Sequence, residues 1–188
     1  DSTVYYIDFS FDKLKLGGSA FAQSLDKIGK EVPTVQDSEY FANAFNAVQE
    51  LINKELILAG HDISAGGMIT TMLEMNFANT EGGLEVSLDE IPEKDLVKIL
   101  FSENPGILIQ VEKTDEVEKI LKKAGVAFIR LARPCDERHL LIHKDGADYQ
   151  FFIDHLRDVW FESSYLLDCK QSGEKAAKDR FLNYKEQP

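Results

Sequence analysis

The residues with the clearest chemical potential lie in one short segment, 61–67, which reads HDISAGG. Asp62 offers the hard carboxylate oxygens that magnesium prefers, and Ser64 offers a hydroxyl to the same cation or to a phosphate. Gly66 and Gly67 stand where a helix is expected to begin, and the first N–H groups of a helix have no partner within it. We therefore expect unpaired N–H groups that a phosphate can approach closely.

A purely structural interpretation of the same segment stays open. Asp and Ser ahead of a helix are ordinary capping residues, and a Gly-Gly pair is an ordinary turn. Residues 17–19, Gly-Gly-Ser, repeat the same chemistry in a weaker form. His139, His143 and His155 show no metal-binding spacing. No Ser-His-Asp grouping, CxxC pair or Walker loop is present.

The segment 61–67 must be positioned by a strand before it and a helix after it. Residues 56–59 are apolar and short, which predicts the strand. After the glycines, Ile69, Leu73 and Phe77 recur at helical spacing and predict the buried face of a helix. The three methionines of the same helix are interpreted as core filler and not as sulfur ligands.

The rest of the chain alternates between strand and helix patterns up to residue 153. Further strands are predicted at 4–9, 84–88, 106–111, 126–132, 139–143 and 149–153. Further helices are predicted at 20–28, from Pro92 onward, and from Thr114 to a stop at Gly125. Another helix is predicted to begin at a cap, Asp37 or Ser38. Its inner stripe consists of Phe41, Phe45, Val48, Leu51 and Ile52. Turns are expected at Pro134 and Asp145-Gly146. Because hairpins follow the alternation, we predict an α/β (α+β) fold of three layers, α/β/α, with a mixed sheet.

The pattern changes near residue 154, which predicts a domain boundary there. An amphipathic helix is indicated by Leu156, Val159, Trp160 and Leu167. Residues 172–184 are polar and Lys-rich, which predicts a second helix. We therefore predict a sheet domain over residues 1–153 and a helical connector over residues 154–188.

Composition narrows the classes of partner. The formal net charge is -12, which repels phosphate backbones and argues against nucleic acid. No apolar run is long enough to span a membrane, and we expect no secretory signal. Cys135 and Cys169 lie far apart in unrelated contexts, so we expect reduced, structural cysteines and a cytoplasmic setting.

Five stretches together resemble the large, glutamine-dependent phosphoribosylformylglycinamidine synthases of purine biosynthesis. They are LGGSA at 16–20, HDISAGG at 61–67, LEMNFA at 73–78, LFSENPG at 100–106 and WFESSY at 160–165. Family members contain two copies of an ATP-binding domain paired with a C-terminal domain of the aminoimidazole ribonucleotide synthetase type, followed by a glutaminase. The resemblance implies that this chain is the second such C-terminal domain plus the connector to the glutaminase.

The resemblance also implies a function. The whole family enzyme uses ATP and glutamine to convert formylglycinamide ribonucleotide into formylglycinamidine ribonucleotide, and this part alone is expected to be inactive. The implied site is an auxiliary one for Mg2+ with ATP or ADP. Asp62 matches the magnesium ligand, Ser64 a nucleotide contact, and Gly66 and Gly67 the phosphate turn. The remaining ligands are expected from the rest of the same polypeptide.

Two alternatives remain at this point. The first is a purely structural, pseudo-symmetric domain that never contacts a nucleotide. The second is a relative such as selenophosphate synthetase or thiamine-monophosphate kinase, which the helical tail from residue 154 argues against. The family often carries Arg and Asp where this chain has Ile63 and Ala65, a departure that bears on the polarity of the turn.

Overall fold

The structure, a computed structural model, describes residues 2–183. Strands and helices alternate along these residues, as the sequence pattern predicts. The strands are β1 (Thr3–Asp8), β2 (Ala59–Asp62), β3 (Gly83–Ser87), β4 (Gly106–Val111), β5 (Phe128–Cys135), β6 (His139–Lys144) and β7 (Ala147–Phe152). The helices are α1 (Ala20–Ser24), α2 (Ser38–Asn53), α3 (Gly67–Phe77), α4 (Leu96–Phe101), α5 (Thr114–Lys123), α6 (Ile153–Ser172) and α7 (Glu174–Leu182).

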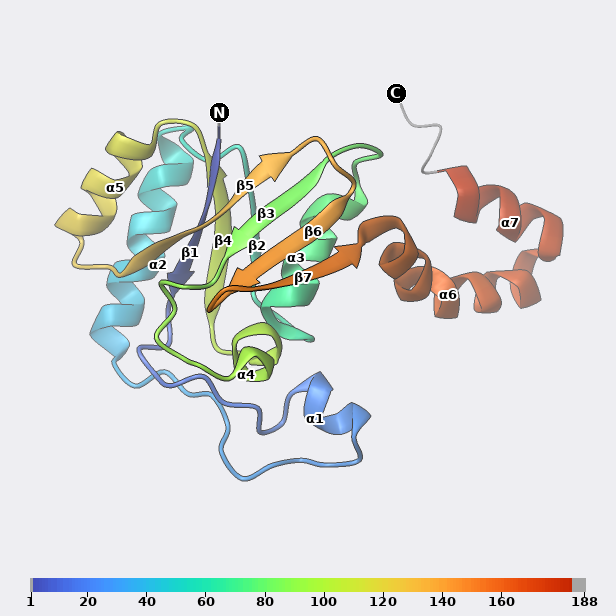
Figure 1. The fold of residues 1–188 in the computed structure, drawn as a ribbon, viewed down its shortest axis with the longest axis horizontal. Helices are drawn as coiled ribbons and strands as arrows, with labels where there is room; N and C mark the ends of the chain where they lie inside the picture. Colours follow the sequence, from blue (N-terminus) through green and yellow to red (C-terminus); the bar gives the residue numbers. More distant parts are fainter. Residues whose placement is uncertain (1, 184–188) are drawn as a thin grey trace.

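The strands form one seven-stranded sheet in the order β2-β4-β1-β5-β3-β6-β7. The pairing of β3 with β6 is parallel, and the other pairings are antiparallel. The sheet is therefore mixed, as predicted from the sequence. β1 lies near its middle, between β4 and β5, and β2 lies at one edge (Figure 1).

Alternation along β1 divides the apolar core between the two faces of the sheet. Val4 and Tyr6 pack on the face covered by α3 and α4, whereas Tyr5 and Ile7 pack on the face covered by α2 and α5. This sandwich is the predicted three-layer arrangement. The layer of α2 and α5 packs on β1, β4 and the start of β5, and the core on that face includes no buried residue of β3, β6 or β7 among the described residues.

The start of helix α2 was predicted correctly, but its buried face was predicted only in part. Asp37 caps it as expected, because its carboxylate accepts the N–H groups of the second and third helical residues. The buried face consists of Ala44, Ala47, Val48 and Leu51. Phe45 and Ile52, assigned to the inner stripe, are 48% and 50% exposed, so that part of the prediction is wrong. Ala44 and Ala47 lie in the core between the helix and the sheet, and the larger Phe45 and Ile52 lie outside it.

Several element boundaries differ from the prediction. The helix expected at 20–28 stops at Ser24, and Asp26 adopts a positive φ of 55° that a helix cannot contain. The strand expected at 56–59 lies at Ala59–Asp62. The helix expected from Pro92 begins at Leu96, where the Asp95 carboxylate accepts two backbone N–H groups.

Of the two turns predicted in this part of the chain, one is wrong and one is confirmed. A turn was expected at Pro134, but this residue lies inside β5, opposite Leu84 of β3. The hairpin expected at Asp145-Gly146 is confirmed, because both residues have positive φ and join the antiparallel strands β6 and β7.

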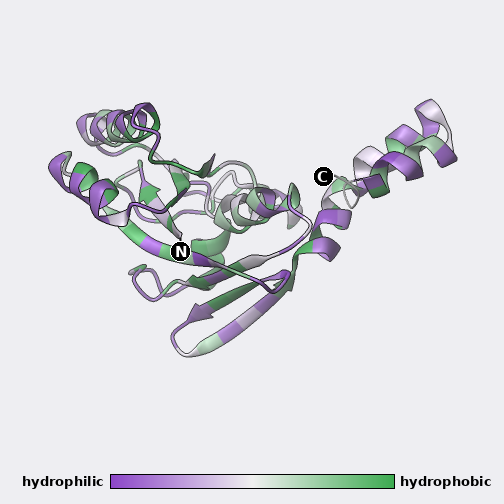
Figure 2. Cartoon of the chain, turned by 90° about the horizontal axis from the view of Figure 1, so that it is seen from above, coloured by the Kyte–Doolittle hydropathy of each residue, from purple (hydrophilic) through white to green (hydrophobic). Residues whose placement is uncertain are grey.

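Helices α6 and α7 form a hairpin that projects from the side of the sheet (Figures 1 and 2). The start of α6 belongs to the core, since Ile153 is fully buried. Trp160 and Phe161 contact Phe77 of α3, with ring centroids 6.5 and 6.1 Å away. The division into a domain over 1–153 and a connector over 154–188 stays a prediction, and residues 184–188 lie outside the described part.

Two further expectations concern the whole chain. Cys135 and Cys169 are free thiols, as expected of a chain without a disulfide framework. Within residues 2–183, no helix combines the length and apolar character needed to cross a membrane.

Neighbouring positions on α2 test the observed helix face. Leu51 is fully buried and Ile52 is half exposed. We expect Leu51→Ala to lower the free energy of unfolding by about 2 to 5 kcal/mol, because it leaves a cavity. Ile52→Ala should change it by only about 0.5 kcal/mol. Chemical denaturation of both variants measures this, and equal losses would mean that the helix is rotated from the face described.

Candidate functional site

The turn from β2 into α3 places its residues alternately outside and inside. Asp62 ends β2 and its side chain is 78% exposed, so its carboxylate faces solvent. Ile63, where the family often has Arg, is buried in the core and its N–H donates to the Gly106 carbonyl at 2.9 Å. Ser64 is exposed again. The apolar Ile63 therefore anchors the turn and leaves its outer surface polar.

The two glycines of this turn are required by packing. Gly66 has φ of 90°, and a Cβ there would collide with the Thr70 side chain. Gly67 has φ of 74°, and a Cβ would lie 2.7 Å from the Leu100 carbonyl oxygen in the backbone of α4. Both positions therefore exclude other residues for structural reasons.

The N–H groups that the sequence predicted to be unpaired have acceptors within the chain. The Gly66 N–H donates to Oε1 of Glu103 at 2.8 Å, and the Gly67 N–H donates to the Ser64 carbonyl at 3.0 Å. The expectation of two open donors is therefore wrong. A carboxylate of the same chain already lies where a phosphate was expected, because an anion is favoured at a helix N-terminus.

Glu103 also contacts the start of α1, directly after the glycine turn at residues 17–19. Its Oε1 accepts the N–H of Ala20 at 2.8 Å. Ala20 begins α1, directly after Ser19, whose hydroxyl caps that helix through the Ala22 N–H. The two Gly-containing turns that the sequence marked as similar thus meet at one carboxylate. Glu103 lies in the stretch 100–106 that resembles the family, but no local pattern predicted a role for it.

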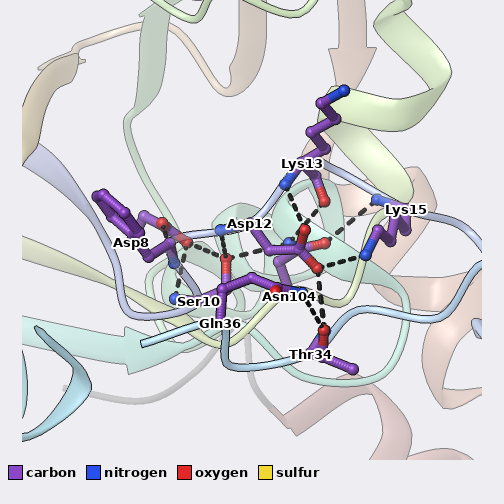
Figure 3. Close-up of polar contacts among 9 residues, drawn as sticks. Asp8, Ser10, Asp12, Lys13, Lys15, Thr34, Gln36 and Asn104 are labelled. Carbon is purple, nitrogen blue, oxygen red and sulfur yellow. Dashed lines mark hydrogen bonds and ion pairs between the residues drawn. The ribbon is translucent and has the colours of Figure 1, made fainter. Parts of the chain in front are cut away.

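The next residue, Asn104, fixes the loop after β1, which carries the glycine turn at residues 17–19 (Figure 3). Its side chain is 1% exposed. The amide nitrogen donates to the Ser10 hydroxyl and to the Lys13 carbonyl, both at 3.1 Å. The amide oxygen accepts the Lys15 N–H at 3.3 Å. Glu103 and Asn104 together therefore tie the segment between α4 and β4 to the loop after β1.

Asp12 completes this polar network (Figure 3). Its carboxylate accepts bonds from the Lys15 ammonium at 2.6 Å and from the Thr34 N–H and hydroxyl. Burial raises the pKa of Asp12. The Lys15 ammonium, the Gln36 side-chain amide and the N–H groups of Lys13 and Thr34 outweigh burial and lower the pKa to about 2. The ionised carboxylate therefore joins both ends of the loop.

The histidines take structural positions. His61 lies on β2, where its Nε2 is 3.3 Å from Oε2 of Glu74 on α3. Nδ1 of His143 lies 2.6 Å from Asp148 across the β6–β7 hairpin.

Over the described residues 2–183, no three His, Cys, Asp or Glu side chains are grouped so that they could hold a metal ion. Asp62 offers a single exposed carboxylate, whereas Mg2+ needs several oxygen ligands and usually completes its shell with phosphates and water.

Comparison with known proteins defines the class of domain. The family model described as "AIR synthase related protein, C-terminal domain" matches residues 7–140. The match covers most of the 188 residues, so the chain belongs to this family.

The full-length relatives are phosphoribosylformylglycinamidine synthases. The chain is 35% identical over 175 residues to the probable chloroplastic/mitochondrial enzyme of Arabidopsis thaliana, covering 91% of this chain and 12% of that protein. It is 31% identical over 175 residues to the Homo sapiens enzyme, covering 90% of this chain and 13% of that protein. The chain thus spans only 12% to 15% of the curated relatives. The resemblance to these synthases, predicted from the sequence motifs, is confirmed.

Solved structures show the same fold. Thermotoga maritima PurL complexed with ATP has a TM-score of 0.63 at 15% identity, over 83% of this chain and 25% of that chain. The same protein complexed with FGAR has a TM-score of 0.62 at 19% identity, over 83% of this chain and 28% of that chain. At such low identity, these matches concern the fold alone.

Substitutions at Glu103 test the junction of the two turns. We expect Glu103→Ala to lower the free energy of unfolding by about 1 to 2 kcal/mol, because the partly buried Gly66 N–H and the exposed Ala20 N–H lose a charged acceptor. Glu103→Gln keeps an oxygen acceptor and should retain most of the stability. Amide hydrogen exchange at Ala20 and Gly66 gives a local readout. Unchanged protection of both amides in the alanine variant would contradict the described contacts.

The low pKa of Asp12 predicts a pH dependence. Because folding depresses the pKa from 3.8 to about 2, the ionised carboxylate stabilises the fold above the unfolded value, and this is lost as pH falls through the folded value. The parent should exceed Asp12→Asn in free energy of unfolding at neutral pH. The difference should shrink between pH of about 4 and about 2. Denaturation series across this range measure it, and a constant difference would contradict the assignment.

Proposed function

We propose that this chain is one domain of a longer phosphoribosylformylglycinamidine synthase. The observation that supports this most strongly is 35% identity over 91% of the chain to a protein of that name. The longer protein is proposed to convert formylglycinamide ribonucleotide, ATP, glutamine and water into formylglycinamidine ribonucleotide, ADP, phosphate and glutamate. The partner of this domain is then the rest of the same polypeptide, and we propose that the domain is inactive alone and resides in the cytoplasm.

Within that protein, the turn at 61–67 is proposed to form part of an auxiliary Mg2+–nucleotide site. Asp62 is the magnesium ligand, and Ser64 contacts the nucleotide together with the backbone of Gly66 and Gly67. The support is the exposure of the Asp62 carboxylate, whose neighbouring His61 ring nitrogen is 3.7 Å away. Mg2+ would neutralise phosphate charge there, and structures of T. maritima PurL carry ATP and ADP.

Glu103 adds a condition to this proposal. A phosphate oxygen can accept the Gly66 N–H only after the Glu103 carboxylate releases it, because both compete for one donor. The nucleotide must therefore gain more from magnesium and from the neighbouring domain than this hydrogen bond provides. This explains why the domain alone should bind the nucleotide weakly.

The alternative is a structural domain without a nucleotide contact. It is favoured by a specific observation: the N–H groups of both glycines have acceptors within the chain. On this view the turn serves to join β2, α3 and α4. The exposed pair Asp62 and Ser64 then has no role. Removing either side chain leaves the nucleotide content and the melting temperature unchanged.

Nucleotide content of the full-length protein separates the two functions. We expect Asp62→Asn to lower the retained nucleotide and the melting temperature, since a bound ligand stabilises only the folded form. Ser64→Ala should have a smaller effect, about 1 kcal/mol for one hydrogen bond. Asp136→Asn, at another exposed aspartate, is the matched control. Parental nucleotide content and melting temperature in both turn variants would favour the structural alternative.

A further inference from the structure

The loop between β1 and α2 has a fixed shape. Its neck is closed by two backbone hydrogen bonds, from Gly17 to the Glu31 carbonyl at 2.8 Å and from Gly18 to the Ile28 carbonyl at 2.6 Å. Gly17 has no room for a side chain against the Glu31 carbonyl. Gly29 has φ of 77°, and a Cβ there would lie 3.0 Å from the Gly17 Cα. Closed surface loops of this kind are frequently functional.

This loop and α1 lie beside α4 (Figure 1). Residues of the loop, of α1 and Lys98 of α4 line a groove there. The groove has a volume of about 400 Å3. Its apolar lining includes Leu14, Leu16, Phe21 and Leu25. Phe21 stacks on Phe101 with a centroid separation of 4.7 Å, and this stack joins the groove to α4. Small-molecule sites have this size range and a largely apolar lining.

The charge around the groove is opposite to that of the chain as a whole. The net charge is -12, yet the lining includes four lysines and one glutamate: Lys15, Lys27, Lys30, Lys98 and Glu31. Lys15 is paired with Asp12, and Lys98 lies 3.8 Å from Glu93. The ammonium groups of Lys27 and Lys30 have no hydrogen bond or ion pair within residues 2–183. These two are therefore available to a ligand.

We propose that this groove binds a small organic anion that carries an apolar ring. The ring packs against Phe21 and Leu25, and the anionic group, a phosphate or a sulfonate, pairs with Lys27 and Lys30. Lysine acts on such groups as a point charge. A protein partner could also cover Leu25, which is 53% exposed, but the concave lining and the unpaired lysines favour a small anion. The groove shares no residue with the turn at 61–67.

Binding of 8-anilinonaphthalene-1-sulfonate to the full chain tests the proposal, because this fluorescent probe joins a sulfonate to aromatic rings. We expect saturable binding of one probe per chain. Lys27→Gln combined with Lys30→Gln should weaken it about tenfold. The matched control combines Lys119→Gln with Lys123→Gln, which removes two exposed charges from α5. It should bind as the parent does.

Two further variants define the site. Leu25→Ser should weaken probe binding, and Asp136→Asn should not, because Asp136 lies outside the groove. All the substituted side chains are exposed, so the melting temperatures should match and show that each variant is folded. Absence of saturable binding by the parent would overturn the proposal. So would parental affinity in the Lys27/Lys30 variant, or an equal loss in the control pair, which would assign the effect to net charge.

Discussion

The arrangement of the candidate site depends on one carboxylate. Glu103 accepts hydrogen bonds from Ala20 and Gly66, which lie far apart in the sequence. It follows α4 and precedes β4, a strand that pairs with β1 in the middle of the sheet. Glu103 thereby ties a long loop and a turn to a segment that leads directly into the middle of the sheet. Asn104 strengthens the same connection through three hydrogen bonds.

The types of element were predictable because each depends on local pattern. The methionines of α3 were correctly interpreted as core filler, since Met68 and Met72 are buried. Errors arose where tertiary contact overrode local preference. In α2 the apolar Phe45 and Ile52 suggested a wider buried stripe, but alanines occupy the contact with the sheet. Periodicity within one helix does not show which part of a broad apolar face the sheet covers.

The candidate site was predictable only in part. Asp62 and Ser64 follow from residue type and from their place before a helix, and both are exposed as a ligand site requires. Glu103 could not be assigned, because its donors lie 37 and 83 residues away. Only the fold brings them together. The same long-range contact occupies the Gly66 N–H, and the Ser64 carbonyl occupies the Gly67 N–H, so neither is the open phosphate donor that a local interpretation suggested.

The central place of β1 has a consequence for how the chain is made. Thr3 pairs with Val111 and Val4 with Ala132, so an apolar strand has no partner until the ribosome has added about 100 residues. At typical rates of synthesis this takes roughly 5 to 20 s. Distant pairings also slow folding after release, because a long loop must close first. During this interval the nascent strand is a natural substrate for chaperones that hold exposed apolar segments.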